Sequence, residues 1–241
     1  PLDGFIFSIT PFNFTSIAGN LPTAPAMLGN TSVWKPASTS VLSNYYLMKM
    51  FQEAGLPKGV INFVPGHGPA IGGVALPDRR LGGVHFTGST GTFQHIWKTI
   101  GENISSYGQY PRIVGETGGK DFVVAHSSAR ATELAVGLVR GAFEFQGQKC
   151  SAASRCYIPK SLWDSVCSEM GEMLAEIRMG DPRDFGNFLA AVIDQSSFNQ
   201  LKAVIDSAKT DANADVVLGG EADDSKGWFV SPTMIKTTDP H

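Results

Sequence analysis

The chain has 241 residues, of which 42% are hydrophobic and 17% are charged. At roughly 150 residues per domain, this length predicts one large domain or two unequal ones, and the composition excludes a disordered chain. The 19 Lys and Arg against 22 Asp and Glu give a net charge of −3 with no basic block, which argues against a nucleic-acid partner. No apolar stretch approaches the roughly 18 residues of a membrane span.

Short β-rich runs alternate with segments of helical period through the first half of the chain. The pattern predicts strands at 4–9, 31–34, 60–64 and 83–86, and helices at 16–28, 38–54, 69–76 and 89–105. Strands separated by helices of this length imply right-handed βαβ units and a parallel sheet with both faces covered.

The rhythm changes after Gly115. Strands are predicted at 121–125, 154–158, 215–218 and 228–230, and helices at 129–145, 161–177 and 196–208. A domain boundary is expected at the pair Gly118-Gly119, with a nucleotide-type unit before it and a second α/β unit after it. The fold class is therefore α/β.

Two strand-to-helix turns are rich in glycine and hydroxyl groups: residues 66–72 and residues 86–91. Each is compatible with an ordinary helix start, and the first departs from GxGxxG because its last spacing is one residue too long. Both would lie at the carboxyl edge of a parallel sheet, where ligands of such sheets bind. Together they favour a nucleotide. Lys35, at the end of a short strand, is either a surface lysine or a partner of the ribose or phosphate.

Two residues could carry chemistry. Glu116, at a strand end beside a glycine pair, is either a paired surface charge or a general base. Cys150 follows Lys149 in a polar turn, where a nearby cation lowers a thiol pKa from about 8.5, whereas Cys156 and Cys167 fit structural positions. The spacing of the histidines and cysteines indicates no metal site and no disulfide framework.

Seven blocks of sequence carry a resemblance to a known family. They are Pro11-Phe12-Asn13-Phe14, Val33-Trp34-Lys35-Pro36, Phe63-Val64-Pro65-Gly66 with Gly68 and Gly72, Phe86-Thr87-Gly88-Ser89, Glu116-Thr117-Gly118-Gly119-Lys120, Gly147-Gln148-Lys149-Cys150 and Gly180-Asp181-Pro182. With these blocks in this order, the chain resembles the NAD(P)-dependent aldehyde dehydrogenase superfamily. The residues within these blocks are most similar to those of the branch that oxidises glutamate γ-semialdehyde (1-pyrroline-5-carboxylate) to glutamate in proline catabolism.

The resemblance implies an aldehyde dehydrogenase fold, with a Rossmann-like NAD-binding domain at 1–118 and part of a second α/β catalytic domain at 119–241. It also implies that Cys150 is the nucleophile that forms a thiohemiacetal with the aldehyde. The side-chain amide of Asn13 and the backbone N–H of Cys150 would form the oxyanion hole, and Glu116 would activate the water that hydrolyses the thioester.

The implied cofactor is NAD. NADP stays open, because many family members carry Glu where this chain has Ser38. The cofactor residues would be Lys35, Ser38, Gly68, Gly72, Gly88 and Ser89. Ser151 and Phe14 would contact the substrate, although a turn residue and a core aromatic are the plain alternatives for these two.

The chain starts with Pro1 and ends before later blocks of the family, so an internal fragment with low turnover of its own is expected. The family implies a homo-oligomeric parent enzyme in the mitochondrial matrix of eukaryotes or the bacterial cytoplasm. Two alternatives remain: an enzyme for another aldehyde, such as succinate semialdehyde or a fatty aldehyde, and an inactive nucleotide-binding fragment.

Overall fold

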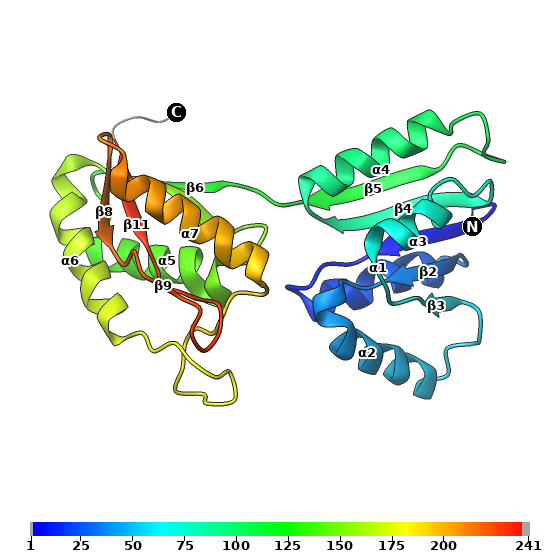
Figure 1. Ribbon diagram of the computed structural model, residues 1–241, viewed down its shortest axis with the longest axis horizontal. Coiled ribbons are helices and arrows are strands. Elements are labelled where there is room, and N and C mark those ends of the chain that lie inside the picture. Colours follow the sequence, from blue (N-terminus) through cyan, green and yellow to red (C-terminus); the bar gives the residue numbers. More distant parts are fainter. Residues whose placement is uncertain (1, 238–241) are drawn as a thin grey trace. The chain divides into compact units, whose positions relative to one another are not determined.

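The computed structural model describes residues 2–237. The chain divides between Gly118 and Gly119 into two compact units, called unit 1 and unit 2 in chain order. Both units mix helices with strands (Figure 1), as the α/β prediction requires.

Unit 1 is built on a five-stranded sheet of order β3-β2-β1-β4-β5, in which every neighbouring pair is parallel. The strands are β1 (Phe5–Ile9), β2 (Thr31–Lys35), β3 (Ile61–Phe63), β4 (Leu81–Gly88) and β5 (Arg112–Thr117). The predicted parallel sheet is confirmed. The alternating pattern does not predict the edge strand β5 as an element of its own.

The helices of unit 1 are α1 (Thr15–Met27), α2 (Val41–Glu53), α3 (Gly68–Ala75) and α4 (Thr90–Glu102). The prediction of one continuous helix at 38–54 is wrong for its first turn, because Ser38–Ser40 forms a separate 3-10 turn, η1. Ser40 has φ −127° and ψ 22°, outside the helical region, so the two segments cannot join.

The two faces of the sheet bury different apolar clusters. Phe7 packs on one face with Ile96 and Ile100 of α4, while Trp34 packs on the other with Ala18 of α1 and Phe51 of α2. Successive side chains of a strand point to opposite faces, so the neighbours Val33 and Trp34 of β2 pack in different clusters. Both faces are therefore covered by helices, as the sequence predicts.

Helix α1 contains two prolines, Pro22 and Pro25. Since Pro25 has no N–H, the carbonyl of Leu21 lacks its usual partner four residues on. Side chains of the sheet bind this carbonyl instead: the Ser8 hydroxyl donates to it over 3.2 Å and His85 Nδ1 lies 3.0 Å away. The prolines thus dock α1 on β1 and β4 through polar bonds.

Unit 2 packs α5 (Ala131–Phe143) against α6 (Lys160–Glu176) through a buried cluster that includes Leu138, Val166 and Met170. Its strand pairs are β6 (Asp121–Val124) with β7 (Ala153–Tyr157), β8 (Ala214–Leu218) with β11 (Met234–Thr237), and β9 (Ala222–Asp223) with β10 (Phe229–Val230). Helix α7 (Gln195–Thr210) precedes β8. The short strands β9 and β11 are not predicted by the sequence pattern.

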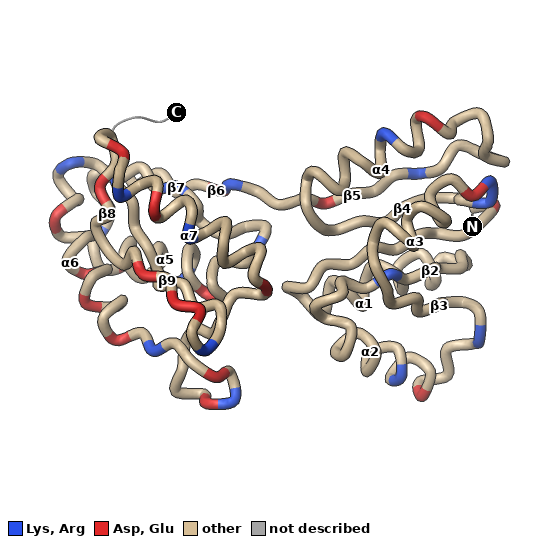
Figure 2. The backbone as a smooth tube through the Cα atoms, in the orientation of Figure 1, with Lys and Arg blue, Asp and Glu red and all other residues tan. Residues whose placement is uncertain are grey.

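Charged residues of both signs are dispersed over the described parts of both units (Figure 2). Among residues 2–237, no helix combines the length and apolar character needed to cross a membrane.

Candidate active site

Five candidate residues of unit 1 belong to the same edge of its sheet. Because all five strands are parallel, their carboxyl ends meet there. Lys35 ends β2 opposite Ile9 of β1, and Glu116 lies near the end of β5 opposite Thr87. Asn13 follows β1 in the loop to α1, Gly68 begins α3 after β3, and Ser89 follows β4.

Lys35 is placed beside the first residue of α3. A Cβ added at Gly68 would lie 3.8 Å from Lys35 Nζ. Desolvation by partial burial lowers the pKa of the Lys35 ammonium group. The ammonium group and the N-terminus of α3 both favour negative charge, so this corner of unit 1 suits an anionic or hydroxyl-rich ligand. Ser38, three residues on, begins η1.

The turn after β4 shows its structural roles directly. The Ser89 hydroxyl caps α4: it accepts from the Thr92 N–H over 3.2 Å and lies 2.8 Å from the Thr92 hydroxyl. A Cβ at Gly88 would meet the Phe86 ring at 2.7 Å, so glycine is needed there for packing; at Gly72 the nearest atom, of Leu76, would be 3.8 Å away. Cofactor contacts of these three residues stay a prediction.

Cys150 lies in a turn of unit 2 that follows the 3-10 turn η2 (Glu144–Gly147). Three successive residues, Phe145, Gln146 and Gly147, have φ values of 55°, 55° and 66°. Left-handed backbone at a residue other than glycine costs roughly 1–2 kcal/mol, so Phe145 and Gln146 store strain just before the cysteine. Backbone strain of this kind clusters at functional sites.

A chain-reversing turn surrounds the partly buried Cys150 itself. The Ala152 N–H donates to the Lys149 carbonyl over 3.3 Å, which closes the four-residue turn from Lys149 to Ala152. Ser151, the candidate substrate residue, is exposed in this turn. The thiol is therefore presented by a closed turn rather than by a helix or strand.

Lys149 has a carboxylate partner. Its Nζ lies 2.5 Å from Glu144 Oε2, and the other oxygen of Glu144 lies 2.6 Å from Arg140. The two cations, Lys149 first, lower the pKa of the Glu144 carboxyl group. The ion pair ties the residue before Cys150 to the start of η2, and the sequence analysis did not single out Glu144. The i,i+4 spacing of Arg140 and Glu144 was the available signal.

Gly119, two residues before β6, comes close to this turn. A Cβ there would lie 2.7 Å from the Cys150 carbonyl oxygen and 2.8 Å from Asp121 Oδ1. At Gly118, by contrast, an added Cβ would meet nothing within 4 Å. Of the glycine pair in the Glu116 block, only the second is required by its surroundings.

Glu116, the candidate base, is exposed in unit 1, so burial within this unit does not desolvate its carboxylate. Asn13 and Phe14 are partly buried at the start of α1, where Phe14 takes the N-cap position. The structure thus brings Asn13 and Glu116 to one sheet edge of unit 1, and it places Cys150 and Ser151 in unit 2.

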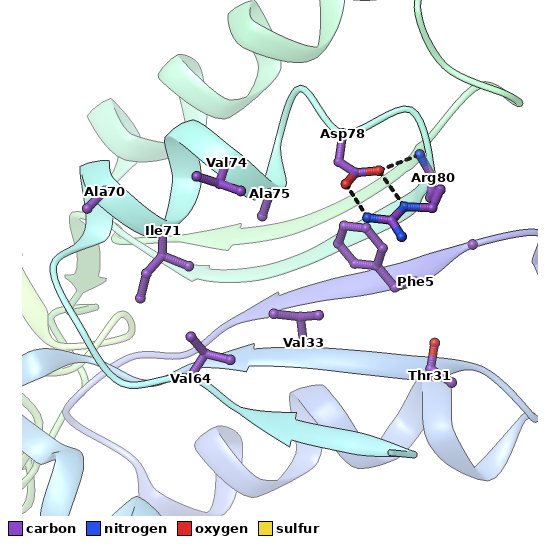
Figure 3. Close-up of a pocket in the computed structure, with 11 residues that line it drawn as sticks. Phe5, Thr31, Val33, Val64, Ala70, Ile71, Val74, Ala75, Asp78 and Arg80 are labelled. Carbon is purple, nitrogen blue, oxygen red and sulfur yellow. Dashed lines mark hydrogen bonds and ion pairs between the residues drawn. The ribbon is translucent and has the colours of Figure 1, made fainter.

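An open apolar cavity of about 810 Å³ lies in unit 1, and none of Asn13, Phe14 and Glu116 lines it. In Figure 3, Ile71 and Val74 of α3 face Val33 of β2, and the Asp78–Arg80 pair stands at one end. No predicted cofactor residue is among the described residues that line it. The cavity runs along the sheet face under α3 and is not the candidate site.

The family model described as "Aldehyde dehydrogenase family" matches residues 1–241. The chain belongs to this family. The predicted aldehyde dehydrogenase fold is confirmed by a solved structure, the Delta-pyrroline-5-carboxylate dehydrogenase from Mycobacterium tuberculosis bound with NAD. The two share 56% identity at a TM-score of 0.97, over 100% of this chain and 45% of that one.

Other aldehyde dehydrogenases are similar over the same region. The 1-pyrroline-5-carboxylate dehydrogenase from Thermus with bound NAD is 30% identical at a TM-score of 0.90, over 97% of this chain and 45% of that one. The mitochondrial delta-1-pyrroline-5-carboxylate dehydrogenase of Dictyostelium discoideum is 49% identical over 100% of this chain and 44% of its own length. The human mitochondrial enzyme of that name is 44% identical over 99% of this chain and 43% of its own length. The chain spans less than half the length of these curated relatives.

The other two cysteines of this aldehyde dehydrogenase chain have a different setting. Cys156 lies on β7 and Cys167 on α6. Desolvation raises the pKa of both thiols, although Cys156 as a whole residue is exposed. Neither Cys156 nor Cys167 forms a disulfide. Within residues 2–237 no group of three or more His, Cys, Asp or Glu could hold a metal ion.

Proposed function

We propose that this chain carries the nucleotide-binding and nucleophile-bearing parts of an enzyme that oxidises L-glutamate γ-semialdehyde, the open form of 1-pyrroline-5-carboxylate, to glutamate with NAD. The observation that carries the proposal is the similarity over the whole chain to structures and proteins named 1-pyrroline-5-carboxylate dehydrogenase. The presence of Asn13, Glu116 and Cys150 at the matching motifs supports it.

In this proposal residues 1–118 are the NAD-binding domain and residues 119–241 belong to the catalytic domain. The corner formed by Lys35 and the start of α3 fits a dinucleotide, because an ammonium group and free N–H groups can bind ribose hydroxyls or phosphate. Ser38, Gly68, Gly72, Gly88 and Ser89 complete the cofactor set. NAD, when bound, supplies the two-electron oxidation that converts a thiohemiacetal into a thioester.

The chain's own residues perform the remaining steps. The Cys150 sulfur bonds to the aldehyde carbon, and the carbonyl oxygen takes up negative charge. The Asn13 amide and the Cys150 N–H donate to that oxygen; the loss of one such donor costs roughly 2.7–4 kcal/mol in the transition state. Glu116 then takes a proton from water, which attacks the thioester carbon and releases glutamate and the thiolate.

Substrate and cofactor choice rest on neighbouring side chains. Ser151 donates to the distant carboxylate of the semialdehyde, and Phe14 packs on its aliphatic part. Ser38 brings no negative charge against a 2′-phosphate, so some use of NADP is expected beside NAD. Replacing it, Ser38→Glu, is expected to suppress NADP use by charge repulsion while NAD use persists.

The parent enzyme is proposed to be a homo-oligomer. We place it in the mitochondrial matrix if the source is eukaryotic and in the cytoplasm if it is bacterial. The relatives from Dictyostelium discoideum and human are named mitochondrial, which supports the first placement.

The test compares Cys150→Ala with Cys156→Ala in the parent enzyme that contains this chain. Cys150→Ala should abolish NADH formation from glutamate semialdehyde yet leave NAD binding intact, whereas Cys156→Ala should retain both. Aldehyde oxidation that persists in Cys150→Ala would refute the assignment of Cys150 as the nucleophile. A kcat/KM that is higher for succinate semialdehyde or a fatty aldehyde than for glutamate semialdehyde would refute the proposed identity of the substrate.

A further inference from the structure

Two glutamine side chains on either side of Gly147 bind one distant segment of unit 2. Gln146 Nε2 donates to the Ala191 carbonyl over 2.8 Å, and the Ile193 N–H donates to Gln148 Oε1 over 2.9 Å. Gln146 therefore uses the nitrogen of its side-chain amide as a donor, whereas Gln148 uses the oxygen of its side-chain amide as an acceptor. Their backbone partners are two residues apart in the chain.

The segment that they bind is itself anchored. Val192, between the two partners, is buried, and its N–H donates to the Trp228 carbonyl over 2.8 Å. The next residue but one, Asp194, caps α7 by accepting from the Ser197 N–H over 2.8 Å. Residues 191–193 are thus a fixed support rather than a free loop.

The turn that they hold needs such support. Phe145 and Gln146 have left-handed backbone that is unfavourable for residues with a Cβ, and Gly147 could not carry a Cβ, which would meet the Ala142 carbonyl at 2.8 Å. Strained backbone persists only where surrounding contacts determine it. The bonds from Gln146 and Gln148 are contacts of this kind, and they stand within four residues of Cys150.

We propose that Gln146 and Gln148 are positioning residues that fix the Cys150 turn against residues 191–193. This inference rests on the proposed function, in which Cys150 is the nucleophile. The segment that precedes α7 thereby sets where the thiol stands within unit 2. The Glu144–Lys149 ion pair closes the turn from inside, whereas the two glutamines attach it to the rest of unit 2.

The change of Gln to Glu affects the acceptor Gln148 and the donor Gln146 differently. In Gln148→Glu a carboxylate oxygen still accepts from the Ile193 N–H, and the long 3.4 Å bond from Nε2 to the Phe145 carbonyl is lost. In Gln146→Glu the donor disappears and a carboxylate oxygen faces the Ala191 carbonyl oxygen. The same change therefore preserves one contact and makes the other repulsive.

The experiment uses the parent enzyme that contains this chain. It measures kcat and KM with glutamate semialdehyde, and the iodoacetamide alkylation rate of Cys150, in each variant. Cys156 and Cys167 in the same sample report whether the fold is intact. Gln146→Glu should lower kcat by about tenfold or more, because small misplacements of a reacting group are costly, with KM nearly unchanged and the Cys150 alkylation rate altered. Gln148→Glu should stay within about threefold of the parent chain in kcat.

Equal behaviour of the two Glu variants would overturn the proposal, as would a Gln146→Glu variant with unchanged kcat and unchanged Cys150 alkylation. If Gln146→Glu fails to fold, Gln148→Ala decides, because it removes the acceptor of the Ile193 N–H, which Gln148→Glu retains. Unchanged kcat and alkylation in Gln148→Ala overturn the proposal, and a kcat restored in Gln148→Glu supports it. The alkylation rates do not depend on turnover, so failure of the proposed function, seen as activity in Cys150→Ala, is distinguishable.

Discussion

The contact between Gly119 and the Cys150 turn gives a sharp test of how Cys150, the proposed nucleophile, is placed. In Gly119→Ala the new methyl group would lie 2.7 Å from the Cys150 carbonyl oxygen, whereas ordinary contact begins at 3.4 Å. The turn or β6 must therefore move by 3.4 − 2.7, about 0.7 Å. The carboxylate of Asp121 can swing aside, but the carbonyl belongs to the backbone. Overpacking of this kind costs roughly 1–3 kcal/mol.

Gly118→Ala is the matched control, because its methyl group would meet nothing within 4 Å. Neither glycine has the positive φ that disfavours side chains. The control should therefore be neutral or gain up to about 1 kcal/mol through the unfolded state. Urea unfolding measures the free energy of both variants, and alkylation of Cys150 reports the displacement. Equal stability of the two variants, with Cys150 alkylated at the parent rate in both, would show that the close approach does not constrain the turn.

Three further predictions concern unit 1. Trp34→Phe removes the 2.9 Å bond from Nε1 to the hydroxyl of the buried Thr10, so it should cost roughly 1–3 kcal/mol in urea unfolding; a loss below the error of the measurement would contradict this. Arg80 lowers the pKa of Asp78 to about 2 from 3.8. This stabilisation is complete above pH 3.8 and is lost as the pH falls through about 2. Asp78→Asn should flatten the acid limb of the stability curve by less than about 1 kcal/mol, since the pair is exposed; an unchanged limb argues against the pair. Lys35→Met should weaken NAD binding about tenfold in a fluorescence titration, or about 1.4 kcal/mol. In the parent chain, affinity should also fall at alkaline pH, earlier than an ordinary lysine would allow because burial lowers the Lys35 pKa; pH-independent binding would exclude the ammonium group.

The arrangement of unit 1 follows from local sequence signals. Alternating strand and helix periods predict a parallel sheet, and a parallel sheet places Lys35 and Ser89 at the same edge. The sequence pattern does not predict the edge strand β5, because its outward residues, such as Arg112, Val114 and Glu116, are exposed and give no apolar run. The sequence signal is therefore strong where a strand has an apolar run, as in the other edge strand, β3, and weak in β5, whose side chains are largely exposed.

The Cys150 turn shows what local sequence cannot predict. Positive φ is the habit of glycine, and no local rule assigns it to Phe145 or Gln146. Their conformation depends on partners 45 residues away, such as the Ala191 carbonyl. The motif around Cys150 predicts which residue reacts, but the support of that residue is a tertiary property.

The prolines of α1 have a consequence for the order of folding. The Leu21 carbonyl is bonded by Ser8 and by His85, which are 13 and 64 residues away along the chain. An isolated segment with the sequence of α1 cannot supply these bonds, so the helix gains full stability only after β1 and β4 have come together. Assembly of the sheet is then a precondition for α1 rather than its result. Contacts this distant in sequence slow folding, and α1 should accordingly acquire hydrogen-exchange protection with the central strands and not before them.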